Sequence, residues 1–281
     1  MSAVKHSCDG CGALMVYDAA TQGLKCPFCG GTKGIPRDEE FVAVEQALDD
    51  VAPSRRRADA PKTFHCERCG AEVTYAGATV SAACPFCGSQ QVVERKGDVD
   101  RILPQAVVPF AVTLEDAKRR WREWLGHGIF RPRRLREVAS GEALKGVYLP
   151  YWTFDTHVYS QWTALAGYHY TVTVGFGKDA RTETRTRWVP ASGDRREFYD
   201  DVLVCASKGV DERLLAKAQE YVLSALQPYR SDYLQGWAAE EYVVDLKPAW
   251  GRAREEVNAM EVSACGRAVP GDTHSDLRVW T

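Results

Sequence analysis

Eight of the ten cysteines fall into two groups whose spacing is typical of metal ligands. The groups are Cys8, Cys11, Cys26 and Cys29, and Cys66, Cys69, Cys84 and Cys87. In each group, two CxxC pairs are separated by fourteen residues. A CxxC turn presents two thiolates to one ion, and two such turns complete the tetrahedron that Zn²⁺ prefers. The spacing therefore predicts two structural Zn²⁺ ions, each with four cysteine ligands and no open position for a substrate water.

These cysteines belong to a duplicated segment. The sequence CDGCGALMVYDAATQGLKCPFCG at 8–30 returns as CERCGAEVTYAGATVSAACPFCG at 66–88, with 12 of 23 positions identical. We call these the first and second cysteine units. The repeat predicts a first zinc ribbon over 1–36, a short helix and linker over 37–62, a second zinc ribbon over 63–96, and an α+β body over 97–281.

Two alternatives to zinc follow from the same residues. Iron held by four thiolates is chemically feasible. Metal-free buried cysteines would leave two segments of roughly 30 residues with almost no core of their own. Disulfides are disfavoured, because Met1 to Gly12 has no apolar signal segment and a cytoplasmic location is expected, where thiols stay reduced. We interpret His6 and His65 as flanking groups, and the solitary Cys205 and Cys265 as small buried hydrophobic residues.

The elements around the cysteine units indicate an α+β protein with a mixed antiparallel sheet and helix body. Phe41, Val44 and Leu48 have helical spacing within 38–50, and 52–62 resembles a solvated linker. Thr113 and Asp116 resemble a capping pair for a helix that ends near Leu125.

The body is predicted to contain a long β-rich region and two later helices. Residues 147–204 are β-rich, with a glycine-containing turn at 175–180 and a charged strand face. The two helices are expected over 211–226 and 248–262, the second with Trp250, Ala253, Val257 and Met260 on one side.

The order of these features resembles a known bacterial family. After the two CxxCG…CPFCG units come a tryptophan-containing helix, LKGVYLPYWTFD at 144–155 and AEEYVVDL at 239–246. This order is similar to that of the TFIIB-type zinc-ribbon-containing proteins, which are often labelled primosomal protein N′ or superfamily II helicase-like. The resemblance spans nearly the whole chain. Because members of that family are longer, it implies that this chain lacks a final strand-rich segment.

No sequence motif of an enzyme is present. The chain has no GxxxxGK[ST] loop to hold nucleotide phosphates, so we expect no helicase activity, and it has no HExxH, GxSxG or deaminase pattern. We interpret the acidic pairs Glu39-Glu40, Glu240-Glu241 and Glu255-Glu256 as solvated helix faces, and His127, His157 and His169 as noncatalytic. The sequence predicts a non-enzymatic protein.

Charge and hydropathy separate the remaining function classes. The formal net charge is −2, and two filled four-thiolate zinc sites would take it to about −6. The longest apolar stretch, Ile102 to Leu114, contains prolines and is too short to span a membrane. We therefore expect an interaction scaffold for a protein partner, in which Leu14-Met15-Val16 either form an exposed contact tip or pack on the neighbouring helix.

The alternative is a module that binds DNA or RNA through a local basic patch, in replication, repair or transcription. The strongest candidate patch consists of Arg131, Arg133, Arg134 and Arg136, since four arginines in six residues cannot easily pair locally. Further basic clusters lie at 55–57, at 118–120, and at Arg181, Arg185 and Arg187.

Overall fold

The computed structural model describes residues 6–53, 63–75, 84–89, 92–94, 101–126, 144–210, 215 and 221–281. This part of the chain is mixed α+β, as predicted, with more strand than helix. Its contacts divide it into two compact units. The cysteine-rich unit comprises Met1–Pro150 and Cys205–Asp245, and the hairpin unit comprises Tyr151–Val204 and Leu246–Thr281. The predicted body over 97–281 is therefore divided between the two units.

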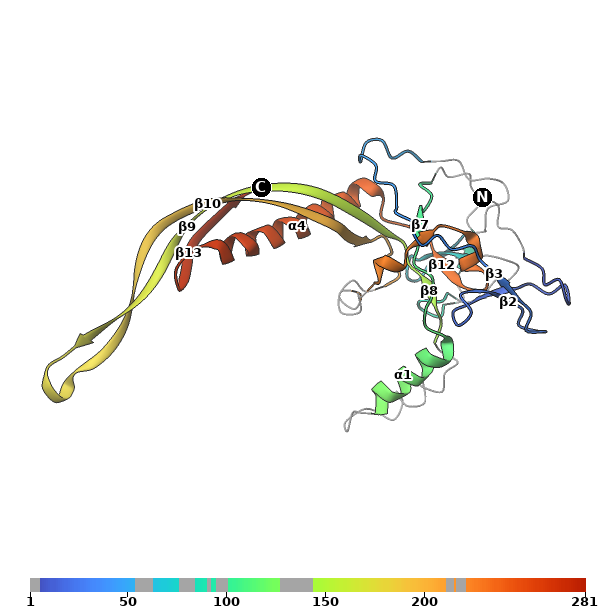
Figure 1. The fold of residues 1–281 in the computed structure, drawn as a ribbon, viewed down its shortest axis with the longest axis horizontal. Helices are drawn as coiled ribbons and strands as arrows, with labels where there is room; N and C mark the ends of the chain where they lie inside the picture. The colour runs from blue at the N-terminus through green and yellow to red at the C-terminus, as the bar shows by residue number, and fades with distance from the viewer. Residues whose placement is uncertain are drawn as a thin grey trace. The chain divides into compact units, whose positions relative to one another are not determined.

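The described residues of the cysteine-rich unit form three sheets, whose strands lie around the labels β2, β3, β7, β8 and β12 in Figure 1. The first has the order β1 (Val16–Asp18), β2 (Gly23–Lys25) and β3 (Thr32–Gly34). The second has the order β6 (Val92–Glu94), β4 (Thr63–Cys66), β5 (Glu72–Tyr75), β12 (Ala238–Glu240) and β8 (Val147–Tyr148). The third pairs β11 (Gln227–Pro228) with β7 (Ala106–Val107). Every pair is antiparallel except β12 with β8, which is parallel.

The first cysteine unit contributes to the core of this unit. Tyr17 and Leu24 are each only 1% exposed and pack with Tyr233 and Leu234. Met15, which precedes β1, joins the same cluster and is 4% exposed. Of the two alternatives for Leu14-Met15-Val16, the exposed tip is therefore wrong, because Met15 is buried and Leu14 and Val16 are half-buried.

The hairpin unit contains two long strands, β9 (Tyr151–Val174) and β10 (Arg181–Cys205), joined by the 3₁₀ turn η1 (Gly177–Asp179). This confirms the predicted hairpin. Gly175 has φ +100°, and a Cβ there would lie 2.5 Å from the Asp179 carbonyl oxygen, so the turn requires glycine. The strand β13 (Thr273–Trp280) pairs antiparallel with β9, which gives the order β10-β9-β13.

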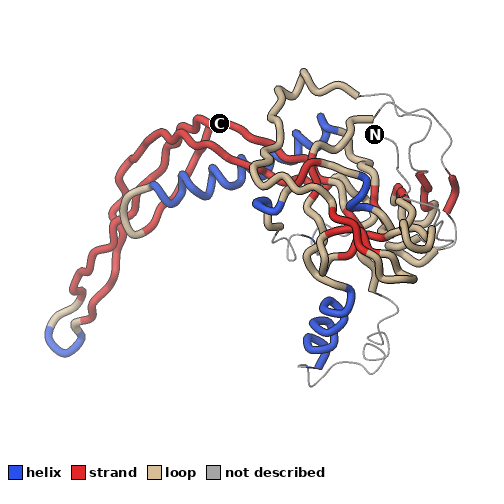
Figure 2. Tube along the Cα trace, turned by 45° about the vertical axis from the view of Figure 1, so that its right-hand side comes forward, coloured by secondary structure: helices blue, strands red, loops and turns tan. Residues whose placement is uncertain are grey.

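The helix α4 (Leu246–Ala268) lies along this sheet, and the hairpin continues past it to its tip (Figures 1 and 2). Trp162, Ala164 and Ala166 of β9 pack with Cys265 of α4. The predicted helix over 248–262 is thus present and longer at both ends. Its buried face continues from Val257 to Glu261, whereas Met260 is exposed, which corrects the face predicted from sequence.

A buried carboxylate fixes α4 on the sheet. Glu261 is fully buried and accepts hydrogen bonds from Ser160 Oγ at 2.7 Å, Tyr199 Oη at 2.5 Å and Arg195 Nε at 3.1 Å. Burial alone would raise the pKa of Glu261, but these three donors hold it below its ordinary value. The three donors satisfy the negative charge of Glu261. Because each donor comes from β9 or β10, the same hydrogen bonds hold α4 against the sheet.

The helix α1 (Leu114–Gly126) confirms the predicted helix and its cap. The Asp116 N–H donates to Thr113 Oγ1 at 3.1 Å, and Thr113 Oγ1 donates to Asp116 Oδ2 at 2.8 Å. Trp121 and Trp124 stack with ring centroids 5.2 Å apart.

Two other predicted helices differ from the structure. Residues 38–50 form turns and irregular chain, because backbone N–H groups bond to distant side chains: Asp38 donates to Gln227 Oε1 and Val44 to Gln105 Oε1. In the predicted helix over 211–226, Leu215 is helical and the described residues 221–226 contain only the 3₁₀ turn η2 (Leu223–Ala225), so the helix does not extend to 226, and the rest of 211–220 lies outside the described residues. A further 3₁₀ turn, η3, spans Ser231–Leu234.

Among the helices of the described residues, none is long and apolar enough to cross a membrane.

Candidate metal centres

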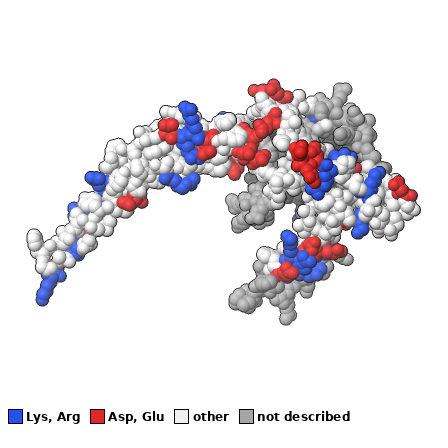
Figure 3. All heavy atoms as spheres, in the orientation of Figure 1, with Lys and Arg blue, Asp and Glu red and all other residues white. Residues whose placement is uncertain are grey.

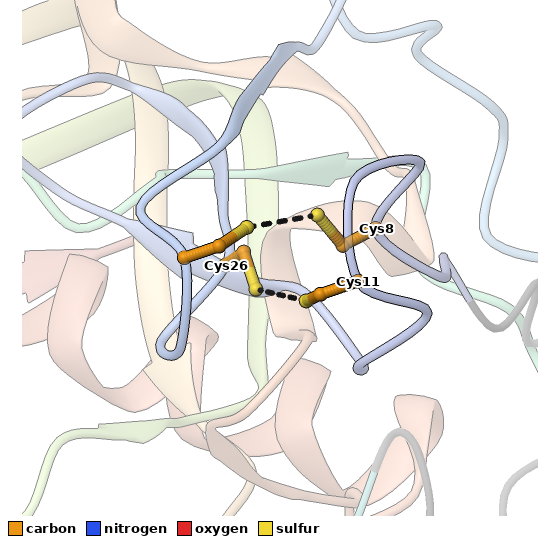
Figure 4. A group of neighbouring side chains, drawn as sticks. Cys8, Cys11 and Cys26 are labelled. Carbon is orange, nitrogen blue, oxygen red and sulfur yellow. Dashed lines mark hydrogen bonds between the residues drawn. The ribbon is translucent and has the colours of Figure 1, made fainter.

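The first cysteine unit brings its four sulfurs together (Figure 4). Cys8 and Cys11 come from one turn and Cys26 and Cys29 from another, and the ligand atoms all lie within 4.8 Å of one another. Sγ of Cys8 lies 3.3 Å from Sγ of Cys29, and Sγ of Cys11 lies 3.5 Å from Sγ of Cys26. Four sulfurs at about 2.3 Å from a tetrahedral Zn²⁺ would be about 3.8 Å apart, so these two pairs need to separate only slightly to reach the spacing of a filled site.

The second cysteine unit repeats this arrangement. Sγ of Cys66 lies 3.6 Å from Sγ of Cys87, and Sγ of Cys69 lies 3.7 Å from Sγ of Cys84. These four ligand atoms also lie within 4.8 Å of one another. None of the eight grouped cysteines forms a disulfide, so neither group is held together by one.

The backbone frames of the two centres match bond for bond. The Gly12 N–H donates to Cys8 O, as Gly70 does to Cys66 O, both at 2.8 Å. In the second turn of each unit, Gly30 donates to Cys26 O at 3.1 Å and Gly88 to Cys84 O at 3.0 Å. All four glycines have φ between +70° and +75°, which explains why each turn has glycine after its second cysteine.

The turns also supply donors to the sulfurs. The N–H groups of Cys29 and Phe28 lower the pKa of Cys26 to about 6. In the second centre, burial opposes ionisation of Cys66, but the N–H groups of Cys69 and Arg68 lower its pKa to about 7. The Gly31 N–H favours a thiolate at Cys29, yet the sulfurs of Cys8, Cys26 and Cys11 raise that pKa to about 12. One thiolate repels the next, and a divalent cation would remove that repulsion.

One stretch of chain, residues 235–241, bonds to both cysteine units, and we call it the shared segment. Tyr17 donates its N–H to Gln235 O at 2.8 Å and accepts from Trp237 Nε1 at its carbonyl at 2.9 Å. In the second unit, β5 pairs antiparallel with β12, and Glu241 donates to Glu72 O at 2.8 Å. The first unit is therefore tied mainly through Tyr17, and the second through a strand ladder.

The two units differ in how far the second turn is covered. Phe28 of the first unit is 82% exposed, and Cys11 and Cys29 are exposed as well. The equivalent Phe86 is half-buried and packs with the core around Cys66 and Cys84. Gly209 lies against it: a Cβ at Gly209 would be 3.0 Å from Phe86 Cγ and 3.0 Å from Ala71 Cβ. We call residues 207–209 the cover loop.

The histidines beside the cysteine units bond to carboxylates. His6 Nε2 lies 2.6 Å from Asp232 Oδ1, and His65 Nδ1 lies 3.0 Å from Glu72 Oε1. Neither belongs to a four-sulfur group. The solitary Cys205 and Cys265 are both buried.

The predicted basic patches are only partly within the described residues. Arg131, Arg133, Arg134 and Arg136 lie outside them, as do Arg55–Arg57. On α1, Arg119 pairs with Asp116 at 2.8 Å. On the hairpin, Arg181 and Arg185 both pair with Glu183.

Glu240 was wrongly interpreted as part of a solvated helix face. It lies in β12, is 6% exposed, and neither of its oxygens has a hydrogen-bond partner among the described residues. Burial raises its pKa, although the Ser207 hydroxyl and the N–H groups of Gly209 and Lys208 lie near enough to favour the charged form. Acidic residues adjacent in sequence gave no signal for this burial, because the strand pairing that causes it is remote.

A third group of ligand-type residues, Asp155, Asp200 and Asp201, was not anticipated from sequence. Asp200 and Asp201 are exposed, and Asp201 has φ +51° with its N–H donating to Asp155 Oδ1 at 2.7 Å. Burial raises the pKa of Asp201, with smaller contributions from the other two carboxylates.

Comparisons with known proteins give one distant likeness. The chain is 25% identical over 275 residues to the uncharacterized protein YdjG of Bacillus subtilis (strain 168), a match that covers 98% of this chain and 76% of that protein. No protein-family profile and no solved structure matches the chain. The aligned residues include both cysteine units and the hairpin unit, and the name of that protein indicates no activity.

Proposed function

We propose that this protein binds two structural Zn²⁺ ions in tandem zinc ribbons and acts as a scaffold for a protein partner. The matched geometry of the two four-sulfur groups carries the proposal. Two sequences that differ at nearly half their positions place four sulfurs in the same backbone frame, with positive-φ glycines and N–H donors at equivalent places. A four-thiolate site suits Zn²⁺ more closely than harder cations.

A structural role follows from the ligand count. Four cysteines fill a tetrahedral ion, so no coordination position is left to activate water. We further propose that the chain is a member of the TFIIB-type zinc-ribbon-containing proteins, that it is not an enzyme and has no helicase activity, and that it works in the cytoplasm.

The test is a metal count on protein purified without added metal. Elemental analysis should give two zinc ions per chain, and the paired substitution Cys26→Ser with Cys29→Ser should reduce this to one. Cys205→Ala serves as the matched control, since that cysteine belongs to neither group, and it should leave two ions. An unchanged count in the paired variant would rule out the ligand assignment, and iron in place of zinc would rule out the metal.

Single-stranded nucleic acid is a second candidate ligand, favoured by the exposed aromatic side chains of the hairpin unit. Tyr159, Phe198 and Trp280 are 44–54% exposed, and the Arg196 guanidinium lies over the Tyr159 ring, 5.2 Å from its centroid. Figure 3 also shows Lys and Arg side chains at the hairpin tip. Aromatic platforms beside cations stack bases without reading sequence.

Fluorescence anisotropy with single- and double-stranded DNA and RNA, repeated across salt concentrations, tests this candidate. Binding that weakens steeply with salt supports it. Tyr159→Ala should weaken that binding, and replacing Arg131, Arg133, Arg134 and Arg136 by Glu should lower its salt slope. No binding even at low salt would eliminate nucleic acid.

A further inference from the structure

The two cysteine units carry the same alanine and phenylalanine at equivalent positions. In the second unit these are Ala71 and Phe86, and in the first they are Ala13 and Phe28. Because the backbone hydrogen bonds of both units match, each alanine follows its first turn and each phenylalanine lies within its second turn in the same geometry. We call them the second and the first Ala–Phe pair.

The second pair is covered by the chain itself. Ala71 is fully buried and Phe86 half-buried, with Gly209 of the cover loop against both. A side chain at 209 would come within 3.0 Å of each, which is tighter than ordinary van der Waals contact, so only backbone without a Cβ fits comfortably. The cover loop is held in place: the Gly209 N–H donates to Ser207 Oγ at 2.9 Å, and Ala206 O accepts from Val243 N at 2.8 Å.

Within the described residues Phe28 of the first pair has no such cover, whereas Ala13 is half-buried and packs against the core that holds Tyr17 and Leu24. Phe28 is 82% exposed, and its neighbours Pro27, Cys29 and Gly30 are exposed too. Phe28 is not among the residues of the core that holds Tyr17 and Leu24, so it does not support the fold of its own unit. A single exposed apolar residue is ordinary on a protein surface. Here the equivalent residue of the second unit, Phe86, is covered by the loop that contains Gly209, which indicates what kind of segment could cover Phe28.

We propose that the first Ala–Phe pair is a docking site for a glycine-containing loop of a partner protein, bound as the cover loop is bound to the second pair. This rests on the proposed function as a scaffold and names its contact surface. Glycine is the specificity element, because a Cβ would meet both members of the pair. Phe28 supplies most of the apolar area that the partner would remove from water.

The test uses a peptide with the sequence of the cover loop as the probe, because that loop covers the second Ala–Phe pair. A peptide with the sequence of residues 206–212, Ala-Ser-Lys-Gly-Val-Asp-Glu, is titrated to about 1 mM, a range suited to weak binding, into the isotope-labelled, zinc-loaded full chain. Amide resonances of Cys26 to Gly30 and of Ala13 should shift, whereas those of the covered second unit should stay in place.

Two variants and one altered peptide separate docking from nonspecific contact. Phe28→Ala should weaken binding at least about tenfold, as expected for a central aromatic contact. Phe176→Ala is the matched control, because Phe176 is 96% exposed at the hairpin turn and should change nothing. A peptide with valine in place of glycine should also lose binding.

Each contrary outcome has a distinct meaning. If zinc content stays at two and the amides of Cys26 to Gly30 do not shift, or shift equally in Phe28→Ala, the docking site is wrong while the zinc proposal stands. If zinc content falls below two in the parent chain, the proposed function fails first. Self-association that Phe28→Ala abolishes, or contacts from Phe28 to another segment of the same chain, would assign the surface to a second copy or to the chain itself and overturn the proposal.

Discussion

The first and second cysteine units have the same backbone frame but are built into the protein differently. The first keeps a three-stranded sheet of its own, β1-β2-β3, and enters the core through Tyr17 and Leu24. The second has no separate sheet, because β4, β5 and β6 continue into β12 and β8. The first copy is attached by backbone hydrogen bonds of Tyr17 and by its buried side chains and leaves its second turn exposed, and the second copy is attached by a strand ladder and is covered. The difference shows that identical turn sequences are compatible with opposite surroundings.

The largest expected difference between the units concerns their phenylalanines. Phe86→Ala should lower the local free energy of opening of the second unit by about 3 kcal/mol, because it removes packing against Ala71 and Gly209. Phe28→Ala should cost under about 0.5 kcal/mol, as for other exposed residues. Hydrogen exchange at the Gly88 and Gly30 amides measures each unit separately. Equal effects would show that the second unit is not covered.

Adding a side chain at Gly209 in the cover loop should lower the stability of the second cysteine unit and bring it closer to that of the first. Gly209→Val places atoms against Ala71 and Phe86 and should destabilise the second unit by about 2 kcal/mol through overpacking. Lys208→Val is the control, because Lys208 is exposed and a valine there lies outside the contact of Gly209 with Ala71 and Phe86. The same amide of Gly88 reports both. An unchanged exchange rate in Gly209→Val would mean that the loop can move away without cost.

Zinc release should distinguish the two centres kinetically. Cys11 and Cys29 are exposed, whereas Cys69 and Cys87 are half-buried. A chelator should therefore remove zinc from the first centre at least about tenfold faster than from the second, which corresponds to a difference of about 1.4 kcal/mol in activation free energy. Absorbance of a zinc-binding dye follows both phases. The variant with Cys26→Ser and Cys29→Ser should lose the fast phase alone. Loss of the slow phase instead would reverse the assignment of the two sites.

The smallest effect concerns Glu240, which lies beneath the cover loop and has no counterpart at the first unit. Its pKa is raised by burial, so the folded protein holds this proton more tightly than the unfolded chain. The contribution of Glu240 to stability is therefore greatest below the unfolded pKa of about 4.3 and is lost as the pH rises through the folded value.

Glu240→Gln should accordingly stabilise the second unit by about 1 kcal/mol at pH 7 and flatten its pH dependence. Thermal unfolding measured from pH 4 to 8 in parent and variant checks this. Glu67→Gln, at an exposed position of the same unit, is the control. Identical pH profiles for parent and Glu240→Gln would show that this carboxyl does not titrate on unfolding.

The sequence predicted what depends on local spacing. The Thr113 cap of α1 and the glycine turn of the hairpin each depend on residues a few positions apart, and each four-cysteine group depends on two CxxC turns within one short segment. It failed where distant chain decides the outcome. The helical spacing of Phe41, Val44 and Leu48 is genuine, yet bonds to Gln105 and Gln227 hold that stretch in another form.

The same limit applies within the candidate sites. Phe28 and Phe86 lie in the same CPFCG pentapeptide, so no local pattern could tell the exposed ring from the covered one. The contact that separates them comes from Gly209, which is more than 100 residues away in sequence. Glu240 was misassigned for the same reason, since its burial depends on pairing with β5.

The shared segment has a consequence for how this protein can change in evolution. The chain contains two copies of the cysteine unit but one copy of the stretch that both bond to. Tyr17 meets that stretch at Gln235, and Glu72 meets it at Glu241, so the spacing between the two attachment points is set by chain length alone. Substitutions there can be absorbed wherever only backbone atoms are used. An inserted or deleted residue would shift one copy out of phase with the other, so selection should act on the length of this stretch more strictly than on its composition.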